Sequence, residues 1–83
     1  MAHLRYKTQG TCSFWIDVDV NDDGNIGDVR FTGGCDGNTK GICSLVRGMK
    51  ASEVKKRLKG ILCGKKSTSC PDQLAHALEK MGY

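Results

Sequence analysis

The sequence predicts one α+β domain in which a three-stranded antiparallel sheet is followed by three helices packed on one of its faces. Two observations lead to this class. Apolar residues alternate with polar ones up to about residue 32, and beyond that point they recur at the spacing of an α-helix. Strands that precede helices, without alternating with them, indicate an α+β domain. We see no repeat or linker, and we expect a single domain over residues 1–83.

The predicted strands show apolar side chains at every second position. Residues 3–8 (HLRYKT) and 14–20 (FWIDVDV) have this pattern, which is typical of strands with one buried face. Residues 21–25 (NDDGN) form a tight turn, and residues 26–32 (IGDVRFT) return with an expected bulge at Gly27. The side chains expected to face the core are Leu4, Tyr6, Thr8, Phe14, Ile16, Val18, Val20, Val29 and Phe31.

Two helices are predicted in the middle of the chain. The first covers about residues 38–47 and ends at Gly48, a typical helix stop. Ser52 is the expected N-cap of the second helix. The apolar side chains expected to face inward are Ile42, Leu45, Val46 and Met49 for the first helix, and Val54, Leu58 and Ile61 for the second.

The third helix is predicted to begin at Cys70. Ser69 and Asp72 have the spacing of a capping box, and Pro71 suits the first turn because it has no N–H to leave unpaired. Helix N-termini favour an anionic thiolate over a thiol, so this cysteine is expected to carry charge. The stripe that continues the helix consists of Leu74, Ala77, Leu78 and Met81.

The composition narrows the function classes. The net charge is +4, and a run of basic residues lies at positions 55–59. We interpret this run as the solvent-exposed face of a helix. Alternatively, it could bind an acidic partner or the phosphate of a nucleotide. Nucleic acid is disfavoured because the aromatic residues are not interleaved with the basic ones. Without a secretory h-region or a long apolar stretch, we expect a cytoplasmic protein that does not enter a membrane.

The chain has five cysteines, and an odd number cannot all pair in disulfides within one chain. Because the expected compartment is reducing, metal binding or thiol chemistry is favoured over disulfide bonds. Cys12, Cys35, Cys63 and Cys70 all occupy loops or element ends, where side chains from distant segments can converge. Four thiolates are a suitable ligand set for Zn²⁺. The alternatives are an iron–sulfur cluster, a redox-active pair of thiols, or thiols without a chemical role. Cys43 lies beside an apolar stripe and is expected to be a small buried hydrophobe. Neither His3 nor His76 is predicted to be a ligand.

At "STSCPDQLA" the sequence resembles the TSCPD domain family, since residues 68–72 spell that string in full. "GGCDGNTKGI" and "LKGILCG" are also similar to the family, so the resemblance covers nearly the whole chain. The family includes C-terminal segments of ribonucleotide reductases and free-standing proteins. The resemblance therefore implies a bacterial-type accessory of ribonucleoside-diphosphate reductase and of DNA synthesis. A chain of 83 residues is too short to be that enzyme itself, so whether it has an activity stays open.

A weaker resemblance connects the chain to the U-type iron–sulfur cluster scaffolds, which have the same order of strands and helices. Their three cysteine ligands would correspond to Cys12, Cys35 and Cys70. The scaffolds carry an aspartate where this chain has Phe14, and here Cys63 is available as a fourth thiolate. This resemblance implies a site that retains its metal instead of passing it on.

Together these observations predict a small metal-binding accessory module with zinc on the four cysteines. Ser69 and Asp72 would cap the last helix and support the ligands through hydrogen bonds. One alternative is a redox protein in which Cys70 attacks and Cys63 or Cys35 resolves, and another is an iron–sulfur carrier. The expected partner is a ribonucleotide reductase or another protein, and nucleotide binding near residues 65–66 stays open.

Overall fold

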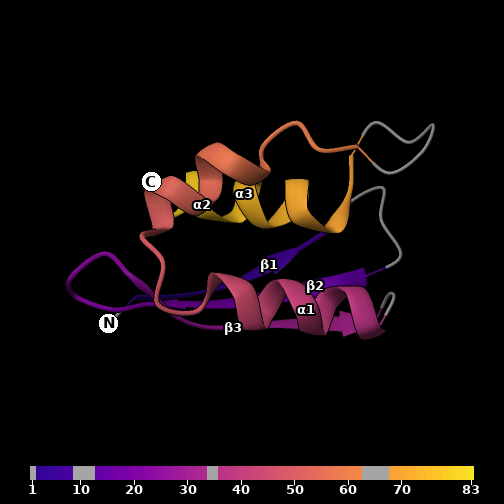
Figure 1. The fold of residues 1–83 in the computed structure, drawn as a ribbon, viewed down its shortest axis with the longest axis horizontal. Helices are drawn as coiled ribbons and strands as arrows, with labels where there is room; N and C mark the ends of the chain where they lie inside the picture. The colour runs from indigo at the N-terminus through magenta and orange to yellow at the C-terminus, as the bar shows by residue number, and fades with distance from the viewer. Residues whose placement is uncertain (1, 9–12, 34–35, 63–67) are drawn as a thin grey trace.

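The computed structural model describes residues 2–8, 13–33, 36–62 and 68–83 and has the predicted order of three strands and three helices (Figure 1). The strands form one sheet in the order β1-β2-β3, and both neighbouring pairs are antiparallel. The predicted meander and the α+β class are therefore confirmed. The elements are β1 (Ala2–Lys7), β2 (Ser13–Val20), β3 (Ile26–Gly33), α1 (Asp36–Val46), α2 (Ala51–Leu58) and α3 (Cys70–Lys80).

The helices cover one face of the sheet. α1 packs on β3 and α3 packs on β2, whereas α2 makes its main contacts with α3 (Figure 1). The opposite face stays accessible and carries charged residues such as Arg5, Asp17 and Arg30. Within the described ranges, no helix has the length and apolar character required to cross a membrane.

The core lies between the sheet and the helices. Its strand residues follow the predicted alternation, because Ile16, Val18 and Val20 of β2 are all buried. α3 contributes Leu74 and Leu78, which are fully buried and match the predicted stripe. The remaining members of the buried cluster are Ile26, Val29, Val46, Ala51, Val54 and Ala77.

A β-bulge at Gly27 changes which residues of β3 face the core. Asp19 pairs with Asp28 and Val20 pairs with Ile26, so Gly27 is the extra residue between the two pairs. The predicted bulge is therefore confirmed. Because the bulge adds one residue, Ile26 and Val29 both point into the core although they are three positions apart, and strict alternation could not assign Ile26 to it.

Several helix predictions were wrong. Ile61 does not face inward with α2: it lies beyond the end of that helix and is 44% exposed. Leu45 does not face the core: its side chain is 77% exposed, because the inward face of α1 runs through Ile42, Cys43 and Val46. Ser52 is not the N-cap of α2. The N-cap is Lys50, two residues earlier, and Lys50 makes no side-chain capping bond. α1 also begins two residues earlier than predicted.

A backbone contact explains why α2 starts without a side-chain cap. The Ala51 amide donates to the Gly24 carbonyl of the hairpin turn at 2.9 Å, so one N–H of the first helical turn has a tertiary partner. Gly48 donates to the Ile26 carbonyl at 2.8 Å, and Ile26 donates to the Met49 carbonyl at 2.8 Å. These bonds join the α1–α2 connection to the β2–β3 hairpin.

Gly48 and Gly41 form a matched pair for testing this connection. Gly48 has φ 85°, which an L side chain rarely adopts, whereas Gly41 lies inside α1, and an added Cβ meets no atom within 4 Å at either position. We expect Gly48→Ala to destabilise the protein by about 1 kcal/mol, and Gly41→Ala to stabilise it by about 0.5–1 kcal/mol. Urea unfolding monitored by circular dichroism measures both changes, and changes of the same sign would contradict the assigned backbone role of Gly48.

Candidate functional site

The segments on either side of the predicted cysteine ligands meet at one end of the molecule. Lys7 pairs with Trp15, and Ser13 pairs with Gly33, so the end of β1, the start of β2 and the end of β3 lie at the same edge. The first residues of α1 and α3 lie at this end as well (Figure 1). The fold therefore brings together chain segments that are far apart in sequence.

Of the four predicted ligands, Cys70 alone lies within the described residues; Cys12, Cys35 and Cys63 lie outside them. In sequence, Cys12 directly precedes β2, Cys35 directly precedes α1, and Cys63 follows the last described residue after α2. In the described part of the chain, no group of three or more Cys, His, Asp or Glu side chains is arranged to hold a metal ion. The four-cysteine arrangement stays a prediction.

Cys70 occupies the first position of α3, and the residue is 7% exposed. Ser69 is the N-cap, in an extended conformation, and Pro71 lies in the first turn. Both features fix the start of the helix directly before and after the cysteine. A sulfur atom at this place lies near the first backbone amides of α3.

Ser69 makes two contacts that hold the start of α3. Its hydroxyl oxygen accepts the Asp72 amide at 3.1 Å, which is the capping bond that the sequence predicts. The same hydroxyl donates to the Ile61 carbonyl, in the connection that follows α2. Ser69 therefore caps one helix and ties it to the segment that leaves the other.

Asp72 has a wider role than the predicted capping box. Its side chain accepts the Gly60 amide at 2.7 Å, directly behind α2, and it also accepts the Thr68 hydroxyl. Gln73 in turn donates to the Thr68 oxygen at 2.9 Å. The Nε2 atom of His76 lies 3.2 Å from the Asp72 carboxylate. This buried network, here called the Asp72 clasp, fastens the end of α2 to the start of α3.

The clasp also controls the charge of Asp72. Burial alone raises the pKa of this carboxyl, but the hydrogen bonds from Thr68 and Gly60 and the neighbouring His76 outweigh that effect. The pKa of Asp72 therefore lies below its ordinary value, and the group is a carboxylate at neutral pH. A buried negative charge is tolerated here because several donors surround it.

Cys43 differs from Cys70 in its surroundings. It is half-buried, packs against the core as predicted, and lines a pocket of ≈ 340 Å³ between β3 and α1. Burial, followed by the charge of Asp28, raises the pKa of the Cys43 thiol, so it stays protonated at neutral pH. Sequence reasoning did not find this pocket, because one basic residue on its wall, Arg30, comes from β3, whereas Lys40 lies in α1 and Arg47 directly follows α1.

The two histidines contact carboxylates. His3 lies beside Asp19 and Asp17 on the open face of the sheet. His76 lies beside Asp72 and is 3.6 Å from Glu79. Both rings therefore have acidic neighbours.

A comparison with protein families gives one match: the sequence model of the TSCPD domain matches residues 2–82. The chain therefore belongs to the TSCPD domain family. No curated protein and no solved structure matches the chain significantly.

The structure assigns a physical role to four of the five residues that give the family its name. Thr68 and Asp72 form the clasp, Ser69 caps the helix, and Pro71 occupies the first turn. These four roles are structural and all act at the start of α3. The fifth residue of the motif, Cys70, occupies the first position of the same helix.

We expect Asp72→Asn to destabilise the protein by about 2–3 kcal/mol, because an amide cannot accept from all donors that now surround the carboxylate. Glu79→Gln is the matched control, since Glu79 pairs with Lys59 at 3.1 Å at the surface, where such pairs contribute below about 1 kcal/mol. Chemical denaturation at neutral pH measures both variants. Equal losses for the two variants would contradict the clasp.

Proposed function

We propose that this chain is a metal-binding accessory domain in which Cys12, Cys35, Cys63 and Cys70 bind one zinc ion as thiolates. The observation that supports this proposal best is the meeting of the strand ends and the start of α3 at one end of the molecule. Each of the three cysteines outside the described residues adjoins one of the segments that reach this end in sequence. The position of Cys70 at a helix N-terminus suits a thiolate ligand.

Zinc is the metal that this donor set suits best. Four thiolates make a closed tetrahedral site without an open position for substrate, which is typical of structural zinc. A domain of this size has a modest core, so a metal that links three loops adds considerably to its stability. The role that follows is structural support of the cysteine end of the domain, and the site as proposed has no catalytic position.

The family points to ribonucleoside-diphosphate reductase as the proposed partner, with the domain as an accessory of DNA synthesis in the cytoplasm. In this proposal the Asp72 clasp holds Cys70 in place, because it fixes the backbone on both sides of that residue. Two other functions remain as alternatives: a thiol-redox protein that uses Cys70, and an iron–sulfur cluster carrier.

Anaerobic purification followed by elemental analysis and an absorption spectrum separates these functions. We expect a colourless protein with one zinc per chain. A brown protein with iron and sulfide would instead support the carrier, and a metal-free protein with a redox-active cysteine pair would support the redox protein. Either result would contradict the zinc proposal.

We expect Cys63→Ser to weaken zinc binding on the order of 100-fold or more, because it removes one of four thiolate ligands. The matched control is Cys43→Ser, which removes a thiol that packs against the core and should keep the zinc affinity unchanged. Competition with a chromophoric chelator measures both affinities. Unchanged zinc affinity in Cys63→Ser would exclude the four-thiolate site.

A further inference from the structure

α1 has two unlike flanks. Cys43 and Arg47 lie on the flank above β3, where both line the pocket between strand and helix. Helical geometry places Ile42 and Leu45 on the other flank, because they are displaced around the axis from Cys43 and Arg47. Within the described residues, α1 makes its extensive contacts with β3 and not with α2 or α3. This second flank therefore has no helix packed closely against it.

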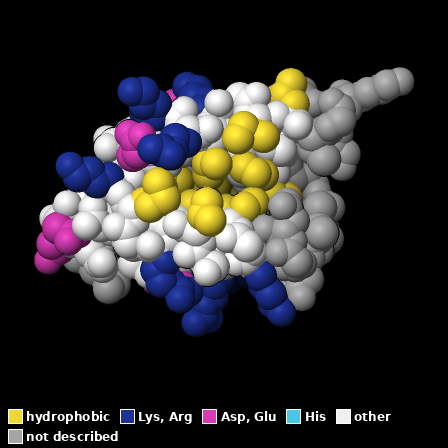
Figure 2. All heavy atoms as spheres, viewed as in Figure 1, with side chains coloured by type: hydrophobic (Ala, Val, Ile, Leu, Met, Phe, Trp, Pro, Cys, Tyr) yellow, Lys and Arg dark blue, Asp and Glu magenta, His cyan; other side chains and the backbone are white. Residues whose placement is uncertain are grey.

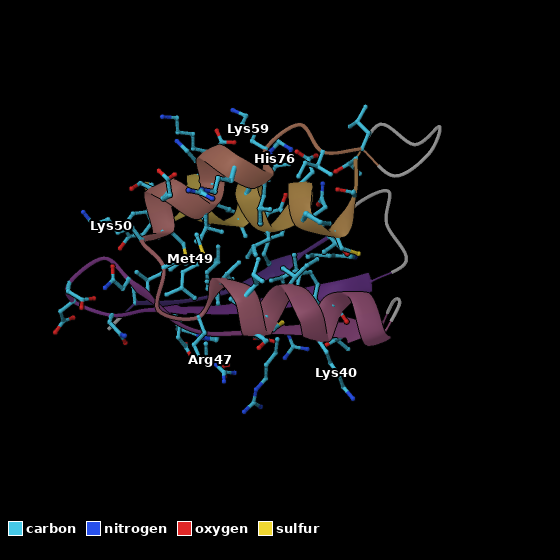
Figure 3. The ribbon with its side chains drawn as sticks, viewed as in Figure 1. Lys40, Arg47, Met49, Lys50, Lys59 and His76 are labelled. Atoms are coloured by element: carbon cyan, nitrogen blue, oxygen red, sulfur yellow. The ribbon has the colours of Figure 1, made fainter. Side chains whose placement is uncertain are left out.

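The uncovered flank is apolar. Leu45 is 77% exposed, while Ile42 and Met49 are half-buried and pack against the core with part of their surface. Apolar side chains gather between α1 and the α2–α3 pair (Figure 2), and the Met49 side chain lies between α1 and α2 (Figure 3). We call Ile42, Leu45 and Met49 the interhelix face. A concentrated apolar surface of this kind on a small domain is typical of an interaction site.

Basic side chains border the interhelix face. Seven of the 13 basic residues of the chain lie between positions 40 and 59, together with a single acid, Glu53. Lys50 and Lys59 lie at the ends of α2, whereas Lys40 and Arg47 lie on the other flank of α1, where they line the pocket above β3 (Figure 3). Lys59 pairs with Glu79 and Arg47 pairs with Asp28, whereas Lys50 is exposed. The face therefore combines an apolar centre with a positive border on its α2 side.

We propose that the interhelix face binds an acidic amphipathic segment of a partner protein. Its apolar side chains would pack on Leu45 and its neighbours, and its carboxylates would lie near the basic border, as charge complementarity requires. A second copy of this chain is a poor occupant, because two positive borders would repel. Nucleic acid is also a poor occupant, because the centre is aliphatic and has no aromatic ring on which bases could stack.

The test uses the ¹⁵N-labelled full chain as purified, so that its result does not depend on the metal proposal. The probe is a synthetic peptide of about 16 residues, with leucines on one helical face and glutamates on the flanks. We expect amide shifts to concentrate around residues 42, 45 and 49, and the peptide to bind at least about tenfold more tightly than a scrambled peptide of the same composition. Equal binding of the two peptides would overturn the proposal.

Three variants locate the contact. Leu45→Lys should weaken peptide binding about tenfold, and since this side chain is exposed, the variant should keep the wild-type circular dichroism spectrum. Lys50→Gln, at the exposed start of α2, should weaken binding about two- to threefold. Lys7→Gln makes the same charge change on the open face of the sheet, beside Trp15, and should have no effect. Unchanged binding by Leu45→Lys, or equal weakening by both lysine variants, would refute the proposed site.

The other occupants are tested with the same protein. Sedimentation should give a monomer at all concentrations, and a dimer that Leu45→Lys abolishes would identify a second copy as the occupant. A single-stranded oligonucleotide should leave the amides of residues 42, 45 and 49 unshifted. If the oligonucleotide shifted these amides more strongly than the acidic peptide, the site would be one for nucleic acid.

Discussion

The carboxylate of Asp72 is the charge on which the helical layer depends. It is buried, and removing a charge from water is costly unless donors replace the solvent. Gly60 and Thr68 supply these donors from segments before and after the α2–α3 connection. A carboxylate in this position thus fixes the geometry of two helices through hydrogen bonds that no apolar side chain could make.

The two ends of the molecule have different roles. At one end, backbone hydrogen bonds join the hairpin turn at Gly24 and Ile26 to the α1–α2 connection. At the other end lie the strand termini and Cys70 (Figure 1). The joined end connects the sheet to the helices through these backbone hydrogen bonds. The segments at the end that holds Cys70 come from the termini of strands and helices, which is the arrangement that binding loops require.

Local signals in the sequence sufficed for much of this fold. Alternation predicted β2, and glycine chemistry predicted the bulge at Gly27, because both depend on residues close together in the chain. The cap at Ser69 followed from the same kind of signal. The prediction for Leu45 was wrong because helical spacing admits two neighbouring faces, and contact with β3 selects one of them.

Nonlocal contacts could not be predicted in the same way. The start of α2 was misplaced because its amide partner, the Gly24 carbonyl, lies in a distant turn. Asp72 was recognised as part of a cap, but its bond to Gly60 spans 12 positions and leaves no local signature. The sequence placed Cys70 at a helix start correctly, while the convergence of segments around it depends on strand register.

The separate attachment of α1 has a consequence for the way in which the native state opens. α3 is held to β2 and α2 to α3, whereas α1 makes its extensive described contacts with β3 alone. We therefore expect detachment of α1 to cost less free energy than global unfolding. In native-state hydrogen exchange, the amides of α1 are then expected to lose their protection before those of α3.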